Sequence, residues 1–189
     1  STYILSGLLR GRYGSEQYMA SHLAGDAIVL LDVDDLGIIA MASSTIGAAR
    51  DYRGISVGAD ISSDSNRSFT YRAINLTPLS PIALTGHRDP SSGDWTLTWV
   101  RRTRTGGEWR DYVDAELGET VEQYQIDIFS DGTYTTVKRT LTVTAPGAAY
   151  PSADQSADFG SDQATLYLRI YQMSSAVGRG YPLTATITR

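Results

Sequence analysis

In Trp95-Thr96-Leu97-Thr98-Trp99-Val100, the bulky apolar residues Trp95, Leu97 and Trp99 stand at every second position, with Thr96 and Thr98 between them and Val100 at the end. Successive side chains of a β-strand point to opposite faces, so this stretch predicts a strand with one face in a core. Residues 123–129 alternate in the same way, and Ser130-Asp131-Gly132-Thr133 after them is typical of a tight hairpin turn. The fold of this half of the chain is therefore decided by paired strands.

Working outward from these two strands, the same pattern recurs at short intervals. Further strands are expected at residues 82–87, 134–143, 165–173 and 183–188. About seven short strands in roughly 110 residues are typical of an immunoglobulin-like sandwich, here without the disulfide because the chain has no Cys. Trp99 is expected to face the opposing sheet beside Tyr124 and Ile170.

The stretch Asn75-Leu76-Thr77-Pro78-Leu79-Ser80-Pro81 contains two prolines in four residues. Proline lacks a backbone donor and biases the preceding residue toward extended geometry, so residues 75–82 are predicted to be a connector without helix. We place a domain boundary there, which divides the chain into residues 1–77 and 78–189.

Residues 1–77 are predicted to form a small β-rich unit with one short helix. The helix is expected from Glu16 to Leu23, with Ser15 as its N-cap and Gly25 as its left-handed stop. Short strands are expected at residues 3–10, 27–31, 36–41, 52–58 and 68–74. A unit of this size has little interior. Some of Leu8, Leu9, Ile38 and Ile39 should therefore be covered by neighbouring proteins.

Composition excludes several classes of protein. The chain has 189 residues, 16 basic against 21 acidic side chains and a net charge of −5, which is the wrong sign for a nucleic-acid binder. No Cys and only two His leave no thiolate or His-rich metal centre. The longest apolar run, Ala27 to Leu31, is far short of a membrane span.

Gly54-Ile55-Ser56-Val57-Gly58 matches the nucleophile-elbow pattern of hydrolases, and Asp60 or Asp64 with His87 completes the order of a triad. The elbow requires a helix directly after it, whereas residues 59–68 read as a polar loop. We therefore predict no catalytic residue and no enzymatic activity.

Three acidic groups are interpreted as solvated rather than as metal-binding or catalytic, and neither a metal site nor a cofactor site is predicted. Asp32, Asp34 and Asp35 fit a turn between strands, because their spacing fails the calcium-loop pattern. Asp154, Asp158 and Asp162 lie four residues apart in an expected water-facing loop, where a bound cation is the alternative. The remaining group forms an exposed acidic connector and consists of Glu108, Asp111, Asp114, Glu116, Glu119 and Glu122.

Basic and aromatic residues are mixed in one segment, as in single-strand nucleic-acid binders. Because acidic residues are interleaved, we expect surface ion pairs instead for Arg101, Arg102, Arg104 and Arg110 beside Trp109. His22 is expected to pack within its helix and to donate to a nearby carbonyl.

Trp99, Tyr124 and the run from Tyr167 to Pro182 resemble a fibronectin type III module. In that family a core Trp, a corner Tyr and a penultimate Tyr-x-apolar-x-apolar strand, followed by a Gly loop and Pro, recur. The resemblance covers residues 78–189. Residues 101–122 and 146–162 depart from it, since they form longer loops than such modules usually carry.

Leu5-Ser6-Gly7-Leu8-Leu9-Arg10-Gly11-Arg12-Tyr13-Gly14-Ser15-Glu16, followed by His22, Gly25 and the apolar residues 28–31, resembles a segment of the tail-tip proteins of siphophages and gene transfer agents. Those proteins share an Arg-Gly-x-x-Gly-Thr motif, a following His and Gly, and a Pro-rich step into a fibronectin type III module. Ser15 replaces the Thr and keeps a capping oxygen. The order of elements spans nearly the whole chain.

The resemblance implies the C-terminal portion of a baseplate-hub or host-specificity protein, located in the virion, and the chain is expected to be part of a longer polypeptide. Its expected partners are other tail or baseplate proteins and two further copies around a three-fold tail axis, with a bacterial surface glycan or receptor as an outer contact. The alternative is an accessory carbohydrate-binding module of a secreted or virion-borne hydrolase. Aromatic side chains that would stack on sugars there are Trp95, Trp109, Tyr112 and Tyr150.

Overall fold

A computed structural model describes residues 4–11, 15–31, 37, 39–108 and 111–189. Contacts within the chain define two compact units, residues 20–75 and residues 1–19 with 76–189. The predicted boundary between residues 77 and 78 stays a prediction, and each unit is described by itself.

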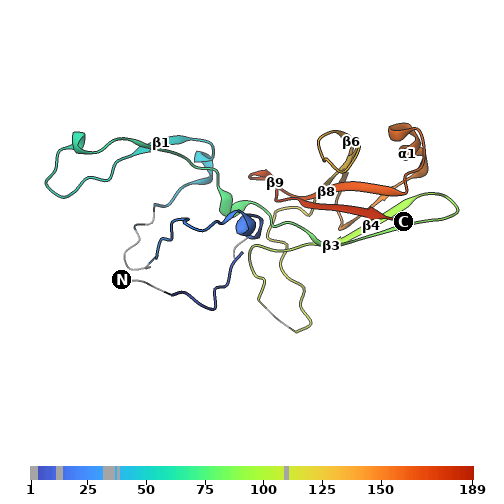
Figure 1. Cartoon of the computed structure of the whole chain (residues 1–189), viewed down its shortest axis with the longest axis horizontal. Coiled ribbons are helices and arrows are strands. Elements are labelled where there is room, and N and C mark those ends of the chain that lie inside the picture. The colour runs from blue at the N-terminus through green and yellow to red at the C-terminus, as the bar shows by residue number, and fades with distance from the viewer. Residues whose placement is uncertain (1–3, 12–14, 32–36, 38, 109–110) are drawn as a thin grey trace. The chain divides into compact units, whose positions relative to one another are not determined.

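Two antiparallel sheets make up the second half of the chain, which is mainly β as predicted (Figure 1). One sheet has the order β3-β4-β7 and consists of β3 (Ile82–Arg88), β4 (Trp95–Val100) and β7 (Gly147–Tyr150). The other has the order β10-β8-β5-β6 and consists of β5 (Tyr124–Phe129), β6 (Val137–Val143), β8 (Thr165–Ser174) and β10 (Leu183–Thr188). The short strand β9 (Gly178–Arg179) pairs with β8.

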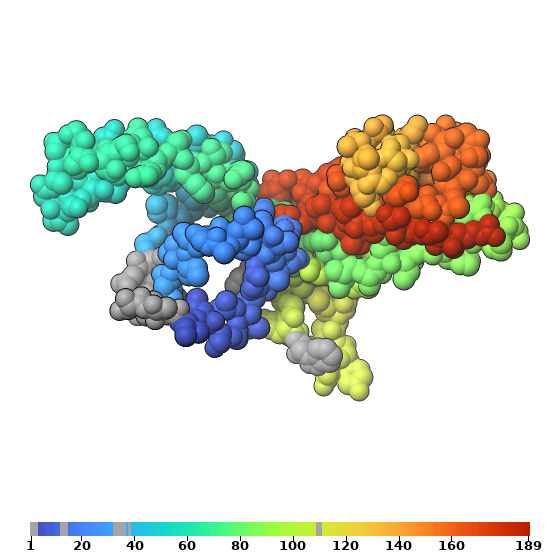
Figure 2. Space-filling model, viewed as in Figure 1, coloured from blue at the N-terminus to red at the C-terminus, as the bar shows by residue number. Residues whose placement is uncertain are grey.

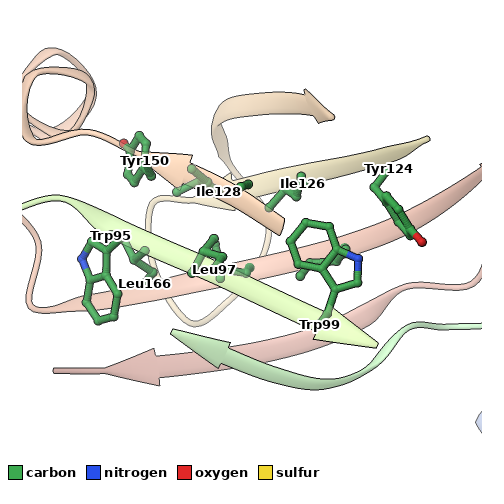
Figure 3. Packing of buried hydrophobic residues seen from close by; sticks show 11 residues of the cluster. Trp95, Leu97, Trp99, Tyr124, Ile126, Ile128, Tyr150 and Leu166 are labelled. Atoms are coloured by element: carbon green, nitrogen blue, oxygen red, sulfur yellow. The ribbon is translucent and has the colours of Figure 1, made fainter. Parts of the chain in front are cut away.

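The core lies between these sheets and draws side chains from both (Figure 3). Trp95, Leu97 and Trp99 point inward from β4, and Leu166, Leu168 and Ile170 do so from β8. The rings of Trp99 and Tyr124 meet edge to face, with their centroids 5.3 Å apart. The expected core position of Trp99 is confirmed, and the alternation of buried and exposed residues along β4 follows the sequence pattern.

Residues 146–162, expected as a long loop, contain strand β7 and the helix α1 (Ser152–Phe159). Pro151 stands at the N-cap with extended geometry, and Gly160 ends the helix at φ 81°, where its N–H donates to Ser156. The buried side chain of Gln155 holds the helix to the sandwich. The loop prediction was wrong because polar helices of two turns carry a weak apolar period.

The proline segment is more ordered than a free connector. The one-turn 3₁₀ helix η6 (Ile74–Leu76) overlaps it, which contradicts the prediction of a helix-free stretch over residues 75–82. Pro78 is fully buried, and its carbonyl accepts the N–H of Tyr181 at 3.0 Å. The helical turn is compatible with the prolines because it ends before the residue that precedes Pro78.

In the described part of residues 4–75, the strands are β1 (Ala49–Tyr52) and β2 (Arg67–Thr70), which form one antiparallel hairpin. The expected strands are not formed at residues 4–10, 27–31 and 39–41, and those expected at 52–58 and 68–74 are shifted. In place of the expected helix over residues 16–23, the structure has the 3₁₀ helix η2 (Glu16–Ser21). Two further 3₁₀ turns, η4 (Ser43–Thr45) and η5 (Ile61–Ser63), lie later in the chain. An apolar stretch becomes a strand only against a neighbour strand, and these described segments have none.

In the portion of the chain that the structure covers, no helix has the length and apolar character needed to cross a bilayer.

Candidate functional site

Apolar side chains are exposed along the first part of the chain. From residue 4 to residue 72, no described residue is buried, and Ile4 and Leu30 are more than nine-tenths exposed. Further exposed side chains are Leu5, Leu8, Leu9, Leu23, Ile28, Val29, Leu31 and Ile39. Exposed apolar groups at this density are typical of surfaces that other molecules cover. We call described residues 4–39 the apolar segment.

The β1–β2 hairpin ends in a long loop, residues 53–66, that is held in shape by polar contacts. Arg53 donates through Nη1 to the carbonyl of Ile61 at 2.7 Å, and Asp64 accepts the N–H of Gly54 at 3.1 Å. Val57 is fully exposed in this loop. In Figure 2 the hairpin, coloured teal, forms a narrow strip.

Ser56 lies in this loop, four residues after β1 ends. Asp60 caps η5 by accepting the N–H of Ser62, and Asp64 is turned toward Gly54. The turn therefore does not connect a strand directly to a helix, which is the geometry that a nucleophile elbow requires. His87 lies on the exposed face of β3 in the other unit.

Arg139 binds two of the three acidic residues considered as a cation site. Asp158 accepts both Arg139 Nε at 2.6 Å and Arg139 Nη2 at 3.1 Å, and Asp154 lies 3.3 Å from the same guanidinium. Burial alone would raise the pKa of Asp158, but hydrogen bonds from Arg139 and Tyr150 and the Arg139 charge outweigh it and lower that pKa.

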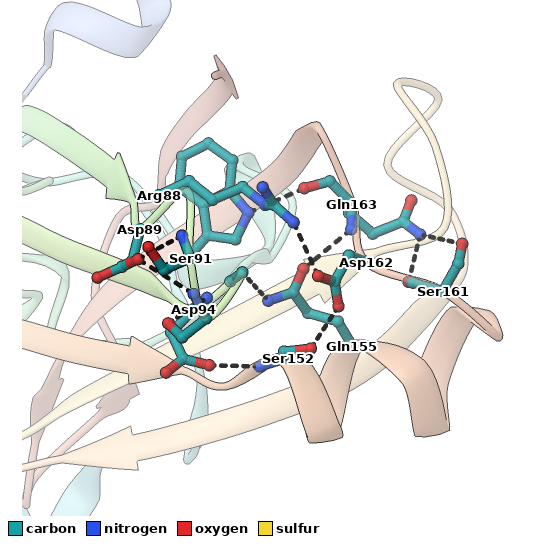
Figure 4. Close-up of polar contacts among 12 residues, drawn as sticks. Arg88, Asp89, Ser91, Asp94, Ser152, Gln155, Ser161, Asp162 and Gln163 are labelled. Carbon is teal, nitrogen blue, oxygen red and sulfur yellow. Dashed lines mark hydrogen bonds and ion pairs between the residues drawn. The ribbon is translucent and has the colours of Figure 1, made fainter.

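The third residue, Asp162, is part of a polar cluster at the end of the sandwich (Figure 4). It accepts Arg88 Nη2 at 2.8 Å and the Ser152 hydroxyl at 2.6 Å. Gln155 donates to the carbonyls of Gly93 and Tyr150 and accepts the N–H of Gln163. These contacts join the β3–β4 turn, α1 and the start of β8, so the cluster has a structural role. Among the described residues, no group of three or more side chains drawn from His, Cys, Asp and Glu is arranged so that it could hold a metal ion.

The loop between β4 and β5 contains the ion pairs expected from its sequence. Arg101 pairs with Asp114 at 2.6 Å and Arg104 with Glu119 at 3.0 Å, while Arg102 pairs with Glu16, which lies outside this loop. The expectation of an exposed acidic connector is wrong at Glu119, whose side chain is 5% exposed because it packs with Arg104. Glu122 accepts the hydroxyl of Tyr124. The predictions for Trp109 and Arg110, and those for Asp32, Asp34 and Asp35, lie outside the described residues.

Two predicted surface aromatics are in the core instead. Trp95 and Tyr150 are fully buried, because both belong to strands whose inward face they occupy. Tyr112 is fully exposed. His22 does not pack in a helix, since η2 ends at Ser21 and its ring lies near Asp26 at the surface.

The outer face of the four-stranded sheet carries a second group of side chains that the sequence did not single out. The centre of the Arg169 guanidinium lies 5.0 Å from the ring centroid of Phe129 and 5.4 Å from that of Tyr134. Tyr134 in turn contacts the ring of Tyr167 edge to face. We call Phe129, Tyr134, Tyr167 and Arg169 the Arg169 cluster. Its sequence signal was the outward position of Tyr167 and Arg169 at a spacing of two on β8.

Farther along the same face, a second arginine is neutralised. Arg179 Nη1 lies 2.5 Å from Oδ2 of Asp127, Nη2 lies 3.0 Å from Oδ1, and Nε donates to Gln125. The guanidinium stacks on Tyr171 at 4.5 Å. This bidentate pair raises the pKa of Arg179 and leaves Asp127 nearly inaccessible.

No protein-family model matches the sequence, and no curated protein sequence matches it. Solved structures similar to the chain include the extracellular domains d3-d4 of rat CD45, with TM-score 0.39, 10% identity and coverage of 89% of this chain and 78% of that one. A human fourth FNIII domain has TM-score 0.39 and 12% identity, and covers 59% of this chain and 78% of its own. An Fn3-like protein from Clostridium thermocellum has TM-score 0.36 and 18% identity, and the match covers 58% of this chain and 91% of that one. The strand order described above, rather than these scores, defines the β-sandwich.

Proposed function

We propose that the chain is a structural component of a phage-type tail tip or baseplate, with a non-enzymatic role in tail assembly. In this proposal the apolar segment and the β1–β2 hairpin bind other tail proteins and copies of the same chain around a three-fold axis. The sandwich contacts the outside, including a bacterial surface. The Arg10-Gly11 motif and the order of elements along the chain support this assignment.

The observation that carries the proposal is the exposure of the apolar segment. Burying a large aliphatic side chain stabilises a complex by about 1.5–3 kcal/mol, so leaving many of them in water is costly. Leu30 is 93% exposed, whereas the sandwich buries its own core. A protein that covers the apolar segment would therefore stabilise the chain further.

A free-standing carbohydrate-binding module is less well supported. It was based on four aromatic residues, of which Trp95 and Tyr150 are fully buried. We therefore do not propose it as a second function.

The proposal is tested by charging one exposed apolar residue. Leu30→Glu removes no buried contact in the isolated chain, so its thermal unfolding is expected to match that of the unchanged protein within about 0.5 kcal/mol. Incorporation of the full-length variant into tail particles should fall by about tenfold or more. The reason is that the variant would bury an unpaired charge in the interface, which is costly. Tyr112→Glu, at a fully exposed position of the sandwich loop, is the matched control and should enter particles normally. Normal incorporation of Leu30→Glu would count against the proposal.

A further inference from the structure

We propose that the Arg169 cluster binds the carboxylate of an acidic saccharide on the outer face of the four-stranded sheet. This inference rests on the proposed function only for the location of that face on the outside of a particle. Its chemistry follows from the cluster itself.

Arg169 differs from the other arginines on the described strands of the sandwich. Arg88, Arg139 and Arg179 each hold a carboxylate within 2.8 Å. Arg169 makes no ion pair or hydrogen bond to any described residue, and its guanidinium lies against the rings of Phe129 and Tyr134 instead. Its Nε is buried without an acceptor, as is the Nε of Arg88. A guanidinium with unused donors on a partly exposed strand position is suited to a planar carboxylate, which it binds through two parallel hydrogen bonds.

The carboxylate opposite Arg169 in the sheet and the one in the adjoining turn are already occupied. Asp127 is the register partner of Arg169 across the β5–β8 ladder, but it accepts two hydrogen bonds from Arg179 and one from Thr140. Asp131 in the adjoining turn accepts hydrogen bonds from Ser130 and Thr133. These two carboxylates therefore do not neutralise Arg169, which leaves its charge available to a ligand.

The rings of the cluster hold the guanidinium in place. Phe129 is almost fully buried beneath it, and Tyr134 stands beside it. Tyr134 has φ 54°, a left-handed conformation that is unfavourable for a bulky residue and is kept here by its ring contacts and its hydroxyl. A cation fixed in this way loses little conformational entropy on binding.

The surroundings favour a sugar over an acidic peptide. Thr184 is the register partner of Arg169 on β10 and is exposed, and Thr186 exchanges a hydrogen bond with the Tyr134 hydroxyl at 2.8 Å. Half-buried Tyr rings and exposed hydroxyls match the apolar faces and hydroxyls of a pyranose ring. On the strand positions of this face, Asp127, Arg169 and Arg179 leave one net positive charge.

The test measures binding of galacturonate oligomers to the full chain by calorimetry, with neutral galactose oligomers of equal length as the comparison. The chain is expected to bind the acidic oligomer and not the neutral one. Arg169→Gln should weaken binding at least about tenfold, the usual scale for losing one bidentate charged contact. Lys138→Gln removes one positive charge from β6 outside the cluster and should change affinity by less than about twofold.

Several outcomes overturn the inference. These are failure of the unchanged chain to bind the acidic oligomer, equal binding by Arg169→Gln with a retained thermal transition, and equal binding of a poly-glutamate peptide. If Arg169→Gln fails to fold, Arg169→Lys keeps the charge and loses the planar fork, and unchanged affinity in that variant would also overturn it. Incorporation of Arg169→Gln into tail particles should be normal, so failure of this site and failure of the proposed function are separately visible.

Discussion

Tyr181 donates its backbone N–H to the carbonyl of Pro78 at 3.0 Å. The contact fixes the proline segment to the chain that leads from β9 into β10, while the neighbouring N–H of Gly180 donates to Gln172. Residue 78 is therefore part of the sandwich, and the residue that permits its approach is Gly180.

Gly180→Ala should destabilise the sandwich. A Cβ at this position would lie 2.7 Å from both the Cβ and the carbonyl oxygen of Pro78, and 2.9 Å from the carbonyl oxygen of Gln172. Backbone atoms cannot move aside cheaply, so we expect a cost of about 1–3 kcal/mol in urea unfolding. Gly37→Ala, whose added Cβ meets no atom of a described residue within 4 Å, should cost less than about 0.5 kcal/mol. Equal costs would show that residue 78 is not held against Gly180.

Gln155→Leu should be more destabilising than its position on a short helix suggests. The side chain is fully buried and makes three hydrogen bonds to backbone groups of Gly93, Tyr150 and Gln163. Leaving these groups unpaired should cost about 3 kcal/mol or more in unfolding free energy. Ser156→Ala, on the exposed side of the same helix, is the control and should be nearly neutral. A neutral Gln155→Leu would contradict the assigned network.

The two core tryptophans should respond differently to replacement by Phe. Trp95 Nε1 donates to the carbonyl of Gln163 at 3.0 Å, whereas Trp99 Nε1 is buried without a partner among described residues. Both replacements lose apolar area, but only Trp95→Phe leaves the carbonyl of Gln163 without its donor. Trp95→Phe should therefore cost about 1–3 kcal/mol more in unfolding free energy than Trp99→Phe. Trp99→Ala should still cost about 3–5 kcal/mol, because it leaves a cavity beside Tyr124. Chemical denaturation of the three variants gives these differences, and the opposite order of the two Phe variants would refute the assignment.

Asp158→Asn should change how stability depends on pH. The pKa of Asp158 is lower in the folded chain than in the unfolded chain, where it is about 3.9. Its contribution is then fully present above the unfolded value and is lost as pH falls through the folded value. The stability difference between the unchanged protein and the variant should be largest near pH 7 and should shrink toward pH 2, measured by urea midpoints. Asp114→Asn, at a carboxylate 87% exposed, should show little difference at either pH.

The sandwich was predictable because its signal is local. Period-two alternation in residues 95–100 and 123–129 gave both strands and their buried faces, and Trp99 and Tyr124 meet as expected. The helix α1 was missed because its one buried residue, Gln155, is polar and is anchored by backbone groups distant in sequence. The prediction that Trp95 stacks on sugars at the surface was wrong, because the alternation along its strand places this side chain in the core.

Residues 4–75 were the least predictable part. Their apolar stretches, such as residues 27–31, read as strands, but a strand requires a neighbour that the described residues do not supply. The Arg169 cluster could not be predicted from the sequence either, because Arg169 lacks an ion pair only since Asp127, its neighbour in the sheet, binds Arg179.

The central claim is that residues 4–75 are completed by neighbouring proteins in a tail tip. Cryo-electron microscopy of assembled particles tests it most directly. The account predicts three copies of the chain around the tail axis, with Leu9, Leu30 and the β1–β2 hairpin buried against other tail proteins and the outer face of the sandwich in solvent. Particles that lack the chain, or that contain it with these apolar side chains facing solvent, would contradict the account.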